Sequence, residues 1–171
     1  MNKNFTKNFL RFAFLLLLQV LVIDHIHISS MMTPYIYILA VLLLPINVSR
    51  WTLLSSAFIL GFVMDIFSGA MGLNIAATVL IAFIRPTLLG LTSFGQGFDS
   101  DYTPNMKELG ADRFISYALI MVLIHHTTLF FLEVFRWSEF GSTLLRIIYS
   151  SFATFLLIIF SQLLFTPRKK H

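Results

Sequence analysis

The sequence contains no cysteine and few charged residues. Without cysteine, the chain can form no disulfide, thiol nucleophile, thiolate metal site or iron–sulfur cluster. Charged residues make up 12% of the 171 residues, about half of the ~25% that is typical of soluble domains. As interpretations of the whole chain, we therefore exclude a soluble enzyme domain, a disordered polypeptide and a dedicated nucleic-acid-binding domain.

Motifs of catalysis and nucleotide binding are also missing. The chain has no glycine-rich phosphate loop, no HExxH, no GxSxG and no recognisable pair of catalytic carboxylates. Asp24, His25 and His27 carry metal-binding groups, but neighbours on a helix do not converge on one ion. We interpret them as a polar edge at the membrane surface, and we expect no enzymatic activity, cofactor or metal.

Hydrophobic residues dominate what is present. They make up 57% of the chain and include 19 Phe, and the mean hydropathy is +0.84. A soluble core of this size could not bury so much apolar surface. The composition predicts an integral membrane protein of the all-α class, with residues 1–171 forming a single membrane domain.

Apolar runs suggest six transmembrane helices. A spanning helix needs about 20 mostly apolar residues, within a range of roughly 17–25. We expect spans at residues 9–28, 34–48, 51–67, 71–91, 114–135 and 141–165. The second is short for a bilayer; Pro34 suits a helix start, and Pro45 would kink or end the helix. The polar residues 92–113 are interpreted as a cytoplasmic connector.

Basic residues predict the orientation. With the N-terminus in the cytoplasm, ten Lys and Arg residues fall on the cytoplasmic side: Lys3, Lys7, Arg11, Arg50, Arg85, Lys107, Arg113, Arg168, Lys169 and Lys170. Arg85 is expected to reach that side by snorkelling from the end of its span. Only Arg136 and Arg146 fall on the other side. This bias predicts that both termini are cytoplasmic.

Asp65 is the most informative polar residue. An ionisable group inside a span is costly and suggests a functional site. It could equally cap a helix, because an Asp carboxylate accepts backbone N–H groups. Gly61, Ser68, Gly69 and Gly72 surround it in the sequence; such small residues favour close helix packing and a turn into the next span.

Three further polar residues within expected spans are secondary candidates. Arg85 is followed by Pro86; His126 and Glu133 are seven residues apart and share a helix face, whereas His125 lies on another. A proton relay or an intramembrane enzyme is conceivable here, but packing with satisfied hydrogen bonds is the favoured interpretation. Glu133 could also pair with Arg136 at i,i+3.

These features resemble the bacterial rod shape-determining protein family MreD. The resemblance is carried by six short spans, a basic N-terminus, Pro34 and Pro45 in the second span, and the pattern Gly61-x-x-x-Asp65-x-x-Ser68-Gly69-x-x-Gly72. By motif it covers about residues 57–86. The connector at residues 92–113 is longer than the family pattern.

The resemblance implies a non-enzymatic scaffold of the rod-elongation complex in the bacterial cytoplasmic (inner) membrane, supporting peptidoglycan synthesis and cell shape. The implied partners are the transmembrane helix of MreC and, further, MreB, RodA, the elongation-specific transpeptidase and membrane lipids. The family is similar in helix arrangement to substrate-binding components of vitamin transporters. A substrate-binding subunit of a small-molecule transporter is therefore the alternative.

Overall fold

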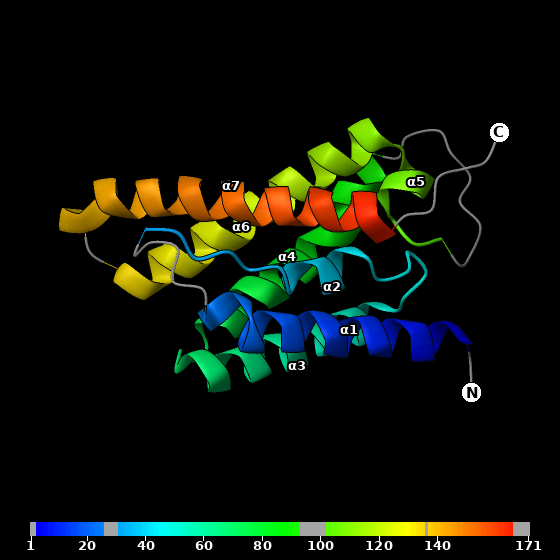
Figure 1. The fold of residues 1–171 in the computed structure, drawn as a ribbon, viewed down its shortest axis with the longest axis horizontal. Coiled ribbons are helices and arrows are strands. Elements are labelled where there is room, and N and C mark those ends of the chain that lie inside the picture. Colours follow the sequence, from blue (N-terminus) through cyan, green and yellow to red (C-terminus); the bar gives the residue numbers. More distant parts are fainter. Residues whose placement is uncertain (1–2, 26–30, 93–101, 136, 166–171) are drawn as a thin grey trace.

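A computed structural model describes residues 3–25, 31–92, 102–135 and 137–165, and the expected all-α class is confirmed for these residues (Figure 1). The helices are α1 (Lys3–Leu21), α2 (Ile38–Leu42), α3 (Arg50–Ser68), α4 (Leu73–Thr92), α5 (Met106–Leu109), α6 (Ala111–Val134) and α7 (Phe140–Phe165). Two short 3₁₀ turns, Ile23–His25 and Trp137–Glu139, follow α1 and precede α7.

Four helices in the described part of the chain are long and apolar enough to cross a membrane. They are α3, α4, α6 and α7, with apolar stretches at Arg50–Ser68, Leu73–Leu91, Ala111–Val134 and Phe140–Leu164. The protein is thus a membrane-embedded multi-pass protein, but the prediction of six spanning helices is not supported. In α1 the apolar stretch is only Asn8–Leu21, and α1 ends before the predicted limit at residue 28.

The second predicted span is wrong as a helix. Of residues 34–48, only the five residues of α2 are α-helical. Pro34 and Tyr35 are non-helical, and α2 ends three residues before Pro45, because proline disfavours helical backbone in the residue before it and cannot supply an N–H. Residues 34–45 are nevertheless all buried. We call these twelve residues the central segment.

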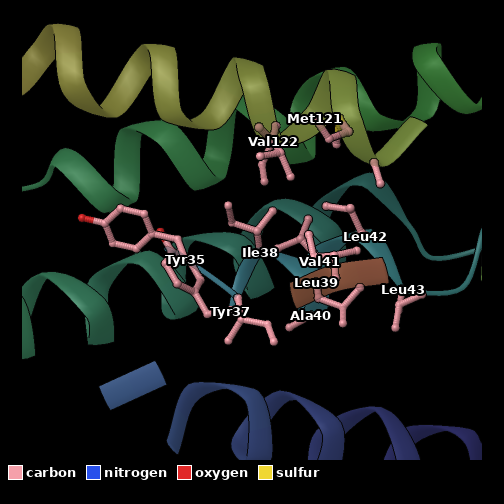
Figure 2. Packing of buried hydrophobic residues seen from close by; sticks show 14 of the residues in the cluster. Tyr35, Tyr37, Ile38, Leu39, Ala40, Val41, Leu42, Leu43, Met121 and Val122 are labelled. Carbon is pink, nitrogen blue, oxygen red and sulfur yellow. The ribbon is translucent and has the colours of Figure 1, made fainter. Parts of the chain in front are cut away.

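The central segment lies inside an arc of helices. Along the arc, α1 contacts α3, α3 packs on α4, α4 on α6 and α6 on α7. From within, α2 contacts α1, α3, α4 and α6. Figure 2 shows Ile38 and Leu42 beside Met121 and Val122 of α6, with α1 on the opposite side. The central segment is as apolar as a membrane span because it is buried among the neighbouring helices.

The helix ends divide between the two ends of the bundle. In Figure 1 the start of α1 and the end of α7 lie at the same end, together with α5 and the start of α6. The beginning of α3 is at that end too, whereas the α3–α4 turn and the α6–α7 connection are at the opposite end. Lys3, Lys7, Arg50 and Arg113 lie in the first two turns of α1, α3 and α6, and Lys107 lies in α5, so these five basic residues belong to the first end, whereas Arg11 lies midway along α1.

Candidate functional site

The Asp65 carboxylate caps the neighbouring helix. Its Oδ1 accepts the backbone N–H of Asn74 at 2.9 Å and the Asn74 side-chain amide at 3.0 Å, and its Oδ2 accepts the backbone N–H of Ile75 at 3.2 Å. These amides belong to the first turn of α4, where backbone N–H groups have no partner within the helix. Of the two interpretations weighed from the sequence, the geometry matches the cap.

The small residues around Asp65 join α3 to α4. A Cβ on Gly61 would lie 2.6 Å from the Ile75 Cα and 2.8 Å from the Asn74 carbonyl oxygen, so the two backbones touch here. Gly69 ends α3 with φ 69°, and Gly72 has φ 86°, conformations that favour glycine. Ser68 accepts the Asn74 side-chain amide at 3.2 Å and donates to the Met64 carbonyl at 2.8 Å.

Arg85 does not snorkel, contrary to the expectation from its position near the end of a span. It is 1% exposed and its Nε donates to the Tyr117 hydroxyl at 3.2 Å. Its guanidinium also donates to the Leu44 carbonyl, and Tyr117 in turn donates to the Leu42 carbonyl at 3.2 Å. The Leu44 carbonyl, just after α2, offers the cation an acceptor inside the bundle, and the position of Arg85 in the sequence could not reveal this acceptor.

His125 joins a buried polar cluster at the start of α2. Its Nε2 lies 2.8 Å from the Tyr37 hydroxyl, which also contacts Asn74 at 3.1 Å and Thr78 at 3.2 Å. All four residues are at most 1% exposed. The His125 Nδ1 is the one nitrogen of this cluster without a hydrogen-bond partner in the described part of the chain.

His126 faces the beginning of the central segment. Its Nδ1 lies 2.9 Å from the Val122 carbonyl one turn earlier in α6, and its Nε2 lies 3.1 Å from the Thr154 hydroxyl. Thr154 also accepts the Tyr35 backbone N–H at 2.9 Å. The Thr154 hydroxyl on α7 thus contacts His126 of α6 and also accepts a backbone N–H of the central segment.

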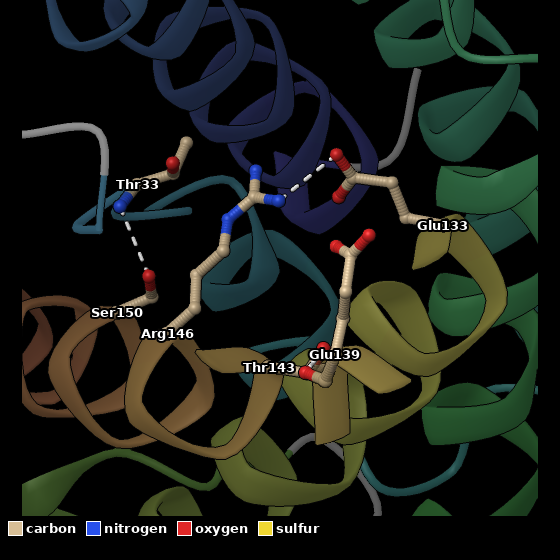
Figure 3. Close-up of polar contacts among 6 residues, drawn as sticks. All are labelled: Thr33, Glu133, Glu139, Thr143, Arg146 and Ser150. Carbon is tan, nitrogen blue, oxygen red and sulfur yellow. Dashed lines mark hydrogen bonds and ion pairs between the residues drawn. The ribbon is translucent and has the colours of Figure 1, made fainter. Parts of the chain in front are cut away.

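Glu133 pairs with a different arginine from the one expected. Its carboxylate lies 2.9 Å from Arg146 Nη1 on α7 (Figure 3), and the Arg146 guanidinium stacks over Phe130 at 4.3 Å. Arg136, the i,i+3 candidate, lies outside the described residues. His125, His126 and Glu133 are hydrogen-bonded to other groups and not to one another in the described structure, although the two histidine rings are in contact, with centroids 5.5 Å apart.

The sequence interpretation missed Gln19 and a polar stripe on α7. Gln19 is fully buried; its amide donates to the Pro34 carbonyl at 3.0 Å and to Asp24 Oδ1 at 2.7 Å, and it accepts the Ile36 N–H at 2.8 Å. On α7, Ser150 accepts the Thr33 N–H at 2.9 Å (Figure 3). The signal was available, because the buried polar residues Thr143, Ser150, Thr154 and Gln162 recur along α7 at helical spacing.

Beyond α2, the central segment leads to a contact with the connector. The Ile46 N–H donates to the Tyr102 carbonyl at 2.9 Å. Burial raises the pKa of the Tyr102 hydroxyl to about 12, so this hydroxyl stays protonated at neutral pH. Residues 93–101 of the predicted connector lie outside the described residues.

The candidate metal-binding residues near the end of α1 do not come together in the described structure. Within the described residues, no three His, Asp or Glu side chains gather as a metal would require. Asp24 meets Gln19, and His27 lies outside the described residues. The polar side chains identified above bind the irregular backbone and the helix ends, and this is the arrangement that membrane proteins need where non-helical chain is enclosed by helices.

Comparison with known proteins gives no match: no family model, no curated protein and no solved structure is similar enough to this chain.

Proposed function

We propose that this chain is a non-catalytic membrane scaffold of the bacterial rod-elongation complex, the role that its resemblance to MreD implies. The observation that carries the proposal is that buried polar side chains hydrogen-bond to backbone groups of this chain. Gln19, Thr154 and Tyr117 bind the backbone of the central segment, and Asp65 binds the start of α4. An interior whose polar groups hold the chain together supports a role exercised through the outer helix surfaces.

The proposed location is the cytoplasmic (inner) membrane, with both termini in the cytoplasm. The support is the charge distribution: five basic residues of the described α1, α3, α5 and α6, namely Lys3, Lys7, Arg50, Lys107 and Arg113, belong to one end of the bundle. Among the described residues, Arg146 is the one basic residue near the other end, and it is paired with Glu133. Basic residues favour the cytoplasmic face.

The proposed partners are the transmembrane helix of MreC and, through the same complex, MreB, RodA and the elongation-specific transpeptidase. Helices in lipid associate by close packing and hydrogen bonds, since lipid tails are as apolar as the helices. The glycine contact at Gly61 is already used between α3 and α4, so it cannot receive a partner helix. The exposed faces of α3 and α7 and the connector remain as contact surfaces.

A substrate-binding subunit of a small-molecule transporter is the second candidate. Two observations favour it: the central segment interrupts helical structure inside the bundle, and His125 Nδ1 has no hydrogen-bond partner in the described chain. Transporters often place substrates where helices are unwound. We prefer the scaffold because the irregular backbone of the central segment is hydrogen-bonded by side chains of both α1 and α7.

Co-purification from mildly solubilised membranes, read by mass spectrometry, tests the proposal. We expect tagged protein to recover MreC and other elongation proteins above the level seen with a tagged multi-pass protein of similar abundance. Recovery of an ATP-driven transporter module without any elongation protein contradicts the scaffold and supports the second candidate.

A further inference from the structure

The outer face of α3 carries an open groove near the start of the helix. Its volume is about 300 Å³, and it is lined by Trp51, Leu54, Ser55, Phe58, Ile59 and Val79. The five α3 residues are spaced along one helix face, and Val79 of α4 forms the opposite wall. Ser55 provides the only polar side chain of the lining, so the groove suits a hydrocarbon chain.

One end of the groove is at the start of α3, and this helix begins with the cationic residue Arg50. Trp51 is 83% exposed, and the preceding Arg50 is exposed as well. Tryptophan is enriched at the interface between lipid and water, and arginine binds phosphate with a fork of N–H donors. From Trp51 to Ile59 the helix rises by about 12 Å, which carries the groove from the interface into the hydrocarbon layer.

Charge at this end favours an anionic occupant. At this end, the first two turns of α1, α3 and α6 together with α5 carry five basic residues, Lys3, Lys7, Arg50, Lys107 and Arg113, against two acidic residues, Glu108 and Asp112. Basic residues near a membrane surface attract anionic lipids by about 1 kcal/mol each. A zwitterionic headgroup would gain much less from the same field.

We propose that this groove binds an anionic phospholipid of the surrounding membrane. Its phosphate meets Arg50 at the interface, and one acyl chain lies along Leu54, Phe58 and Val79. The site combines a cation with an adjacent apolar groove. A free phosphate could bind the arginine, but it would leave the apolar groove empty. The inference concerns lipid binding and stands apart from the identity of the protein partners.

Fluorescence quenching of Trp51 tests this site. The chain has two tryptophans, so Trp137→Phe leaves Trp51 as the only emitter. The protein is placed in bilayers that mix brominated phosphatidylcholine with unlabelled phosphatidylglycerol, and recovery of Trp51 emission gives the relative affinity of the two lipids. We expect phosphatidylglycerol to bind about fivefold more tightly, the factor that corresponds to one basic residue near the surface.

Two variants localise the effect. Arg50→Gln should bring the relative affinity close to one, whereas Lys107→Gln, which removes an exposed cation at the same end of the bundle, should keep the preference. Ser55→Phe, which fills the groove, should reduce quenching by brominated chains of either lipid. Glycerophosphoglycerol, the soluble headgroup of phosphatidylglycerol without its acyl chains, should leave Trp51 emission unchanged.

Equal affinity for the two lipids in the parent protein overturns the proposal. So does an equal loss of preference in Arg50→Gln and Lys107→Gln, because general surface charge and not this groove would then be responsible. Should Ser55→Phe fail to fold, the comparison of Arg50→Gln with Lys107→Gln still decides, since both side chains are exposed and their replacement leaves the core intact.

Discussion

At the residue scale, several buried polar side chains of this membrane protein hydrogen-bond to backbone groups. Asp65 receives the first amides of α4, and Gln19 binds both the carbonyl and the amide groups at the start of the central segment. An unsatisfied backbone group in hydrocarbon costs several kcal/mol. These residues therefore have a structural explanation that requires no ligand.

Replacing Asp65 separates the cap from a charge-dependent role. Asp65→Asn keeps one acceptor for Asn74 and should lower the free energy of unfolding by about 1 kcal/mol, whereas Asp65→Leu leaves two buried amides unpaired and should cost about 3 kcal/mol. Thermal unfolding of the purified protein in detergent measures both. If Asn and Leu abolished function equally at normal folded yield, the carboxylate charge itself would be required.

Gly61 should tolerate no larger side chain. A Cβ there meets α4 backbone at 2.6 Å, so Gly61→Ala must push two helices apart and should lower stability by about 1–3 kcal/mol. Gly90, also in a helix, has nothing within 4 Å of an added Cβ; Gly90→Ala is the matched control and should be neutral or slightly stabilising. Similar melting temperatures for the two variants would show that the contact is not tight.

At the element scale, the sequence predicted the long helices well and the central segment poorly. Spans expected at 51–67, 71–91, 114–135 and 141–165 correspond to α3, α4, α6 and α7 within a few residues, because an apolar run of about 20 residues has few other solutions. Residues 34–48 are equally apolar, but they are buried by protein. Hydropathy alone does not distinguish lipid from a protein interior.

The candidate site was predictable only in part for the same reason. Asp65 and its glycines stood out because a carboxylate and small residues are unusual inside an apolar run. Gln19 and Thr154 did not, since a single amide or hydroxyl in a span is common. Their roles depend on which backbone groups they meet more than ten residues away, and only the three-dimensional arrangement supplies that information.

Gln19 should control how firmly the central segment is held. Gln19→Leu removes the partners of the Pro34 carbonyl and the Ile36 N–H, so amide exchange at Ile36 should accelerate by roughly tenfold or more, corresponding to about 1–3 kcal/mol. Hydrogen exchange with mass spectrometry in lipid discs measures it. Leu17→Met, at an exposed position of α1, is the control, and unchanged exchange in Gln19→Leu would mean that other contacts hold the segment.

At the scale of the whole molecule, the absence of cysteine makes the orientation directly measurable. We expect Lys107→Cys, at the basic end, to react with a membrane-impermeant maleimide only after cells are permeabilised, because basic residues favour the cytoplasm. Ser138→Cys, exposed between α6 and α7, should react in intact cells. The opposite pattern would invert the proposed topology.

The arrangement of five helices around an irregular, fully buried chain is the central feature of the molecule. Under the proposed function, the interior is a structural core and the outer surfaces bind other proteins and lipid. The two candidate functions make different predictions for one atom, His125 Nδ1. In a scaffold this nitrogen would contact at most a water, whereas in a transporter subunit it would bind the substrate.

The most direct test is a high-resolution cryo-electron microscopy map of the protein purified with its partners from native membranes. For a scaffold, we expect residues 34–45 in place, the 2.8 Å contact between His125 and Tyr37 intact, protein partners on the outer helix faces, and at most a water at His125 Nδ1. Density for a bound small molecule against His125, with the central segment displaced around it, would contradict the scaffold.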